Sequence, residues 1–329
     1  MSVHRLNLKG LVAPVFTPMR PDGSLDADAV WALADHVARQ RLAGVFCCGT
    51  SGEGASLSVQ ERKMVLDWWC EAAAGRFPVI AQAGAAGITD TLLLAAHAGA
   101  AGAAAVAVLP PFYFKPAGVK DLVGYCADVA DAAGGLSFYY YHIPSMTHVA
   151  LPMREFLALA SERVPTFAGL KYSDSDLADF GRCVSFAQGR FDLFYGRDEM
   201  LLSALAVGAT AAVGTTYNLI APLYERMIRA FVGGDIATAR DLQHRSREIV
   251  AAMERFGGLP AMKAAMAFVG IDCGPCRRPL ATLDAAQRST LRDELGRLGF
   301  FDFVRPEGAD DRERPGTLAF TRPGESGGP

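Results

Sequence analysis

The sequence has little net charge and no long apolar run, and both absences exclude classes of protein. Its formal net charge is −3, which gives no global electrostatic case for binding nucleic acid or an anionic membrane. No stretch reaches about 18 apolar residues without a polar interruption, which argues against a membrane span. Residues 1–9 lack the long apolar segment of a secretory signal, so we expect a cytoplasmic protein.

The cysteine pattern is neither that of a disulfide framework nor that of a zinc site. Seven cysteines, an odd number, indicate free thiols in a reducing compartment. Cys273-Gly-Pro-Cys276 is a single CxxC motif without a second pair. The GxxxxGK[ST] pattern of nucleotide-binding loops is also missing from the glycine-rich turn that follows the second apolar run.

Alternating apolar runs and helical patterns are the main architectural signal. Each of eight expected strands, the first two of them continuous apolar runs, precedes a segment with helical spacing, as in parallel sheets covered by helices. Eight such units in about 220 residues predict an α/β fold of the (β/α)8 TIM-barrel type. An open doubly wound sheet is the alternative, but no GxGxxG follows the first run. The expected strands are Gly10–Phe16, Gly44–Cys48, Val79–Ala83, Ala104–Leu109, Ser137–Tyr141, Phe167–Lys171, Asp192–Tyr195 and Ala211–Thr215.

Local signals place several helices and divide the chain. Asp26 opens the first helix, and Ser58 with Glu61 forms a capping box for the second. The helix after the eighth strand is expected to begin near Pro222. Residues 1–233 are then the catalytic barrel, 234–303 a C-terminal helical extension of the same domain, and 304–329 a mobile tail. The extension is expected to contain helices at Ile236–Phe256, Pro260–Val269 and Asp284–Leu298.

Lys171 lies where a barrel enzyme carries its chemistry, at the carboxyl end of a strand. Four small or apolar residues precede it, and an amine in such surroundings loses water and its proton. A neutral lysine can attack a carbonyl and form a Schiff base. The alternative is a lysine whose stem reaches past the strand to solvent.

Two other strand ends offer partners for this amine. Tyr141 lies one strand–helix unit earlier, at similar depth, where its phenol can relay a proton; a core tyrosine is the alternative. Thr50 and Ser51 lie in a glycine-rich turn whose N–H groups and hydroxyls suit a small carboxylate, unless it is an ordinary βα turn. Thr50 is also placed to hydrogen-bond Tyr141. No cluster of histidines and carboxylates at the strand ends suggests a metal.

Three motifs together resemble one enzyme superfamily. Gly49-Thr-Ser-Gly-Glu53, Tyr141-His-Ile-Pro144 and Gly169-Leu-Lys171 are similar to signatures of the dihydrodipicolinate synthase and N-acetylneuraminate lyase superfamily of class I aldolases. The resemblance extends from about Gly10 to Pro279 and is strongest to the lyase branch. The synthase branch has an arginine near Met146, which this sequence lacks.

The resemblance implies a role for each matching residue. Lys171 would form the Schiff base, Tyr141 would move the proton of the substrate's 4-hydroxyl, and Thr50 with Ser51 would hold the carboxylate. Tyr113 matches an aromatic that reaches a neighbouring subunit's site. The positions matching contacts to the polyhydroxyl tail of the sugar are Ser173, Gly196, Asp198, Glu199 and Thr215. A homotetramer is implied, with no cofactor and no metal.

The implied reaction is reversible cleavage of N-acetylneuraminate to pyruvate and N-acetylmannosamine. Two departures leave alternatives open: the branch has a serine where Thr215 stands and a glycine where His148 stands. His148 either narrows the sugar pocket or is a solvated loop histidine. A related aldolase or dehydratase acting on another 2-keto sugar acid is the second hypothesis, and a non-catalytic sensor of such acids is the third.

Overall fold

Eight apolar segments form parallel strands that close into a barrel. The computed structural model describes residues 5–305. Each strand pairs in parallel with the next one along the chain, and β8 pairs with β1, which confirms the predicted TIM barrel. The strands are β1 (Gly10–Pro14), β2 (Gly44–Cys47), β3 (Val79–Gln82), β4 (Ala105–Val108), β5 (Ser137–His142), β6 (Phe167–Tyr172), β7 (Asp192–Tyr195) and β8 (Ala211–Val213).

Every residue of these strands is buried. One face of each strand meets the barrel interior and the other meets the surrounding helices, which explains the continuous apolar runs. The prediction extended the first and last strands too far, to Phe16 and Thr215. The last strand ends at Val213 because Gly214 accepts a hydrogen bond from the Tyr217 N–H, and the chain turns there toward the next helix.

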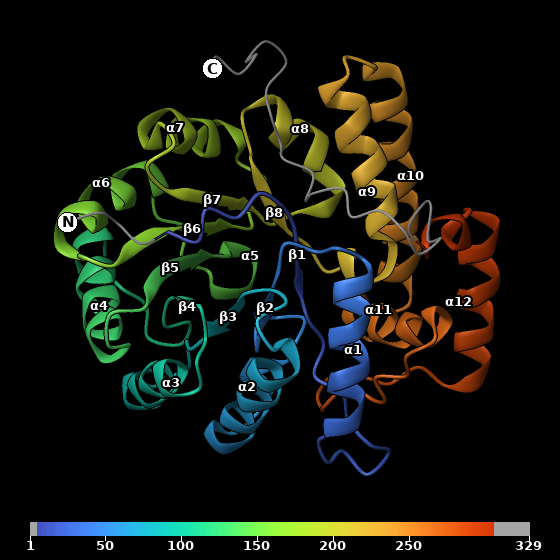
Figure 1. Ribbon diagram of the computed structural model, residues 1–329, viewed down its shortest axis with the longest axis horizontal. Coiled ribbons are helices and arrows are strands. Elements are labelled where there is room, and N and C mark those ends of the chain that lie inside the picture. Colours follow the sequence, from blue (N-terminus) through green and yellow to red (C-terminus); the bar gives the residue numbers. More distant parts are fainter. Residues whose placement is uncertain (1–4, 306–329) are drawn as a thin grey trace.

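Helices follow the strands and surround the barrel (Figure 1). They are α1 (Ala27–Arg39), α2 (Val59–Ala73), α3 (Ile88–Ala100), α4 (Val119–Ala132), α5 (Pro144–Thr147), α6 (Met153–Arg163), α7 (Leu177–Ala187), α8 (Leu201–Ala206), α9 (Tyr217–Val232), α10 (Ile236–Arg255), α11 (Leu259–Ala265) and α12 (Ala285–Arg297). Short 3₁₀ segments are η1 (Gly54–Ser56), η2 (Asp198–Met200), η3 (Met266–Val269) and η4 (Phe300–Phe303).

Side-chain caps fix two helix starts that the sequence predicts. The Glu61 N–H donates to Ser58 Oγ at 3.2 Å, and the Ser58 N–H donates to Glu61 Oε2 at 2.8 Å, which confirms the capping box of α2. Asp284 caps α12 in the same way, because it accepts a 2.8 Å hydrogen bond from the Gln287 N–H. Each pair satisfies backbone donors that the first helical turn leaves open.

The helix expected near Pro222 begins earlier, at Tyr217, and contains a kink. Ile220 has a non-helical backbone, with φ −133° and ψ 41°, between a short first turn and the regular helix that contains Pro222. Proline lacks an N–H and its ring crowds the preceding turn, so the helix cannot run straight through this point. The first turn is therefore oriented separately from the rest of α9.

Two apolar cores result from this architecture. The outer core lies between the sheet and the helices and includes Tyr140, which packs against Phe156 with ring centroids 4.5 Å apart. The inner core fills the barrel and includes Tyr139 and Tyr141 on the opposite face of the same strand. Tyr139 donates to Asp192 at 2.8 Å at the amino-terminal end of the barrel. Tyr141 alone of the three tyrosines points toward the carboxyl end of the interior, where the cavity described below lies.

The three helices expected after the barrel are present, and α9 to α12 gather on one side of it (Figure 1).

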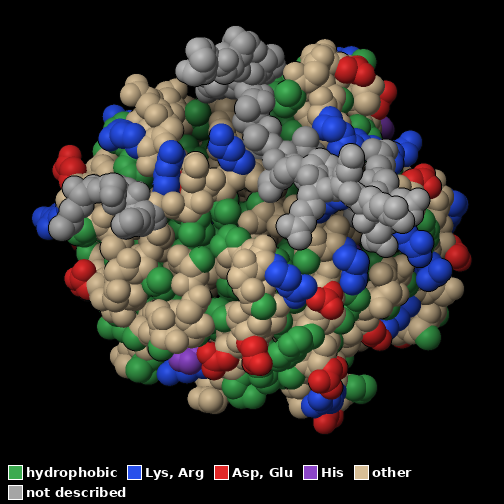
Figure 2. All heavy atoms as spheres, in the orientation of Figure 1, with side chains coloured by type: hydrophobic (Ala, Val, Ile, Leu, Met, Phe, Trp, Pro, Cys, Tyr) green, Lys and Arg blue, Asp and Glu red, His purple; other side chains and the backbone are tan. Residues whose placement is uncertain are grey.

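Both acidic and basic side chains are spread over the face in Figure 2. No helix within residues 5–305 combines the length and the apolar character that crossing a membrane requires. The predicted tail, residues 304–329, lies outside the described residues except for Val304 and Arg305.

Candidate active site

Lys171 lies inside the barrel near the carboxyl end of β6, and its residue is only 3% exposed. Its Nζ atom lies 3.8 Å from the ring centroid of Tyr141 and 4.0 Å from that of Phe46. Burial lowers the pKa of Lys171 to about 7, although the nearby Asp198 carboxylate acts in the opposite direction. A large fraction of this amine is therefore neutral and nucleophilic at neutral pH.

Tyr141 pairs with Lys171 in the register of β5 and β6, as their spacing predicts. Its Oη lies 3.3 Å from Thr50 Oγ1, and the Ser173 hydroxyl, which makes no hydrogen bond within the described residues, also acts on it. Burial raises the pKa of Tyr141, while these two hydroxyls lower it. The phenol is therefore protonated at neutral pH and connected to polar groups that can relay its proton.

The turn after β2 presents donors to the same space. Thr50 and Ser51 line the cavity, and Ser51 Oγ lies 2.8 Å from Thr215 Oγ1 in the turn after β8. Within residues 5–305, neither the Thr50 N–H nor the Ser51 N–H has a hydrogen-bond partner. Two free N–H groups beside two hydroxyls make a concave site for an anion such as a carboxylate.

A cavity of about 280 Å³ joins these groups at the carboxyl end of the barrel. It is also lined by every residue predicted to contact the sugar tail: Ser173, Gly196, Asp198, Glu199 and Thr215. Gly196 leaves room that a side chain would take, because a Cβ there would lie 1.9 Å from Ser173 Oγ. The predicted residues, apart from Tyr113, are thus brought together in one place.

Asp198 and Glu199 differ in their surroundings. Asp198 is buried and accepts hydrogen bonds from the Thr216 N–H at 2.8 Å and the Thr216 hydroxyl at 2.6 Å. Burial raises the pKa of Asp198 to about 6, against the effect of these bonds. Glu199 instead pairs with Arg197, whose Nη2 lies 2.6 Å from Oε1. The cavity therefore offers one fixed carboxylate near Lys171 and one ion pair farther along the loop after β7.

Tyr113 and His148 do not line the cavity within residues 5–305. Tyr113 is 75% exposed, and its ring centroid lies 5.0 Å from that of Phe114, which is 84% exposed. His148 is exposed at the end of α5, with φ 53°, a left-handed conformation that suits glycine. This position favours the solvated-loop interpretation of His148 over a residue that narrows the pocket.

Several lining residues were not predicted from the sequence. Arg197 directly precedes two predicted residues, so its place after β7 was a usable signal. Ile143, Ser145 and Met146 likewise follow the end of β5. Val250, Glu254, Leu259 and Met262 come from α10 and α11. These four residues do not follow the ends of barrel strands, so that expectation could not identify them. They reach the cavity because the C-terminal helices pack against the barrel.

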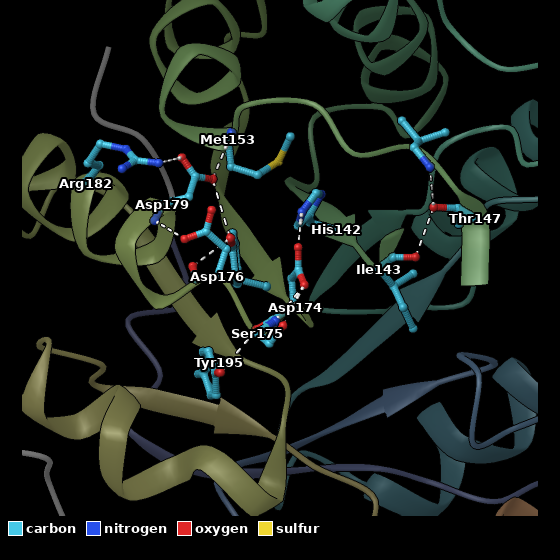
Figure 3. Close-up of polar contacts among 12 residues, drawn as sticks. His142, Ile143, Thr147, Met153, Asp174, Ser175, Asp176, Asp179, Arg182 and Tyr195 are labelled. Atoms are coloured by element: carbon cyan, nitrogen blue, oxygen red, sulfur yellow. Dashed lines mark hydrogen bonds and ion pairs between the residues drawn. The ribbon is translucent and has the colours of Figure 1, made fainter. Parts of the chain in front are cut away.

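Polar side chains of β5, β6, β7 and the loops that follow them contact one another on the helix-facing side of the sheet (Figure 3). His142 points outward from β5, opposite to Tyr141, and its Nε2 lies 3.7 Å from Asp174 Oδ2. Burial lowers the pKa of His142 to about 4, so the ring is neutral at neutral pH. Tyr195 donates to the Asp174 carbonyl at 3.1 Å, which ties β7 to the loop after β6.

Metal-ligating side chains are not grouped in the part of the chain that the structure describes. Among residues 5–305, no three His, Cys, Asp or Glu side chains are placed to hold a metal ion. The seven cysteines are free, including Cys273 and Cys276 of the CxxC motif.

Comparison with known proteins gives relatives over nearly the whole described chain. Residues 7–298 match the dihydrodipicolinate synthetase family. N-acetylneuraminate lyase from Gallus gallus is 41% identical over 281 residues, covering 84% of this chain and 91% of that protein. The structure of Proteus mirabilis N-acetylneuraminate lyase aligns with a TM-score of 0.87 at 38% identity, over 89% of this chain and 99% of that one.

A second solved structure gives the same result. N-acetylneuraminate lyase (sialic acid aldolase) from Aliivibrio salmonicida aligns with a TM-score of 0.87 at 38% identity, over 89% of this chain and 97% of that one. Both the sequence match and the structural match span the barrel and the helices after it. The superfamily expected from the three motifs is confirmed, and the chain belongs to the dihydrodipicolinate synthetase family.

Proposed function

We propose that this chain is a Schiff-base aldolase that cleaves N-acetylneuraminate reversibly to pyruvate and N-acetylmannosamine. The observation that carries the proposal is the buried Lys171 amine against the Tyr141 ring, in one cavity with the free N–H groups of Thr50 and Ser51. The named relatives at about 40% identity support the same reaction.

Each residue of the site has a separate role in the proposed cleavage. Lys171 attacks the 2-keto carbon of the open-chain sugar acid, and loss of water gives an iminium that withdraws electrons. Tyr141 gives its phenolic proton to the hydroxyl that leaves as water, and the resulting phenolate accepts the proton of the 4-hydroxyl while the C3–C4 bond breaks. The aldehyde leaves as N-acetylmannosamine, the enamine takes a proton at C3, and hydrolysis releases pyruvate and the free amine. Thr50 and Ser51 hold the carboxylate throughout.

The cavity also supports recognition of a long polyhydroxyl tail. Asp198 and Glu199 offer carboxylate oxygens, and Ser173 and Thr215 offer hydroxyls, along one wall. Such acceptors suit several adjacent sugar hydroxyls. An aldolase or dehydratase for a shorter 2-keto sugar acid is the second candidate, favoured by Thr215, whose hydroxyl is already engaged by Ser51.

Borohydride reduction in the presence of pyruvate tests the Schiff base. A mass adduct on the peptide that contains Lys171 is expected, and Lys171→Ala should form none. An adduct in the alanine variant would disprove the assignment. Pyruvate release measured across sialic acids and shorter keto-sugar acids then separates the two substrate classes.

We further propose a cytoplasmic homotetramer in which Tyr113 completes a neighbouring subunit's site. The high exposure of Tyr113 and Phe114 supports a role in contact between subunits. The free thiols support a reducing compartment. Mixing inactive Lys171→Ala subunits with inactive Tyr113→Ala subunits should restore activity, since a hybrid site then has both residues. Continued inactivity of mixtures that do exchange subunits would count against a shared site.

A further inference from the structure

A buried ion pair lies directly behind the turn that carries Thr50 and Ser51. Lys263 Nζ on α11 lies 2.6 Å from Glu53 Oε1, and the two side chains are 1% and 0% exposed. Glu53 Oε2 accepts a 2.6 Å hydrogen bond from the Arg277 N–H. Lys263 also donates to the Pro275 carbonyl at 2.7 Å. Both buried charges therefore have an opposite charge and a further hydrogen bond.

This ion pair is close to the cavity but does not line it. Thr50 and Ser51 face the cavity, whereas Glu53 and Lys263 are absent from its wall within the described residues. Glu53 has φ 54° and ψ 28°, a left-handed backbone that residues with a Cβ disfavour. This conformation sends its side chain away from the cavity and toward α11.

The turn is held on several sides. Inside it, the Glu53 N–H donates to the Thr50 carbonyl at 3.0 Å. At the end of β1, the Thr17 hydroxyl donates to the Gly52 carbonyl at 2.7 Å. Glu53 connects the turn to α11 through its ion pair with Lys263, and it also accepts a hydrogen bond from the Arg277 N–H.

The segment 273–277, which contains the CxxC motif, braces the same region. The Met19 N–H donates to the Cys273 carbonyl at 3.0 Å, and Arg277 pairs with Glu61 of α2 at 2.6 Å. Arg277 also donates to the Gly23 carbonyl at 2.7 Å. The segment thus joins the loop after β1, the turn after β2 and α2 into one support.

A buried ion pair is poor evidence for stability, because removing two charges from water offsets most of their attraction. Its better-supported use is to select one geometry among close alternatives. Donors that hold an anion need such selection, since small errors in direction weaken their bonds. We propose that Glu53 and Lys263 are positioning residues that hold the N–H groups and hydroxyls of Thr50 and Ser51 toward the carboxylate of a 2-keto acid; this rests on the proposed function.

The test compares two probes that both carry a 2-keto group. Pyruvate has a charged carboxylate, whereas methyl pyruvate is its neutral ester, and both can be trapped on Lys171 by borohydride. The concentration that gives half-maximal trapping is measured for each probe with the full chain. The variants are Glu53→Gln, Lys263→Gln and the double variant. Asp35→Asn is the control, because it also replaces a carboxylate by an amide but breaks an exposed ion pair with Arg76 that is not part of this support.

In either single variant, half-maximal trapping by pyruvate should need about tenfold more probe, the effect of one weakened hydrogen bond to a charged group. Methyl pyruvate should change much less. The double variant leaves no unpaired buried charge, so it should fold and recover part of the preference for pyruvate. Asp35→Asn should match the wild type with both probes.

Equal weakening of both probes, or no weakening of either, would overturn the positioning role. If a single variant fails to fold, the double variant decides, because its loss of preference for pyruvate over the ester is still measurable. Absence of any adduct in the wild type would instead overturn the proposed function, and the inference with it.

Discussion

The Nζ atom of Lys171 lies over the ring of Tyr141, 3.8 Å from its centroid, and the two residues are paired between β5 and β6. The ring shields the amine from water on one side while the phenol oxygen extends toward Thr50. A nucleophile and a proton carrier are therefore held on adjacent strands by backbone pairing, without dependence on a flexible loop.

The rate of Schiff-base formation should rise with pH around 7. Burial lowers the pKa of Lys171 from 10.5 to about 7, so the amine loses its proton as pH passes through that value. Because only the neutral amine attacks, the trapping rate at low pyruvate should climb between about pH 6 and 8 and then level off. Stopped-time borohydride trapping at a series of pH values measures this. A rise that continues toward pH 10 would show that the amine is not desolvated.

Replacement of Asp198 by asparagine should move that profile to lower pH. The Asp198 carboxylate raises the pKa of Lys171, so removing its charge leaves the lowering effect of burial unopposed. Asparagine can still accept the hydrogen bond from the Thr216 N–H. Glu199→Gln is the matched control, because Glu199 is paired with Arg197. A shift to higher pH in Asp198→Asn would contradict the charge coupling.

Tyr141→Phe should lower kcat by about 10²- to 10⁴-fold, the usual contribution of one proton-transferring group. The KM should change little, since the ring that packs beside Lys171 is kept. Tyr139→Phe is the control: its hydroxyl donates to Asp192 at the opposite end of the barrel. That variant should keep the wild-type kcat even if it is less stable. Steady-state kinetics of pyruvate release separates the two outcomes.

Two glycine-to-alanine changes should alter stability in opposite directions. At Gly54 a Cβ would lie 1.9 Å from the Cys48 carbonyl oxygen, and neither backbone can move away easily, so Gly54→Ala should cost about 3 kcal/mol or more. Gly124 lies within α4, and no atom beyond its own stretch of helix lies within 4 Å of the position that an added methyl group would take. Gly124→Ala should therefore stabilise the protein by up to about 1 kcal/mol. Urea denaturation followed by circular dichroism measures both changes.

The sequence predicted the barrel and its central chemistry because both depend on local patterns. Strands buried on two faces must be apolar throughout, and parallel pairing then brings Tyr141 level with Lys171. The cap at Ser58 follows equally from three neighbouring residues. Each of these features is determined within one or two strand–helix units.

Features that depend on distant packing could not be predicted in this way. Met262 and Glu254 reach the cavity because α10 and α11 pack against the barrel, and no short-range pattern specifies that contact. The early start of α9 at Tyr217 is a similar case, since Asn218 in its first turn donates to the Pro14 carbonyl, 204 residues away in the sequence. The contact between Glu53 and Lys263 is a third case, because these residues are 210 positions apart in the sequence.

The contact between Glu53 and Lys263 joins residues 210 positions apart, and that between Ser51 and Thr215 joins residues 164 apart. During synthesis, the residues of β5 and β6 are added to the chain before either distant partner. A nascent chain thus contains Lys171 and Tyr141 before it contains Thr215 and Lys263, the residues that contact the turn after β2. The contacts that support the proposed carboxylate site are accordingly among the last that this chain can form.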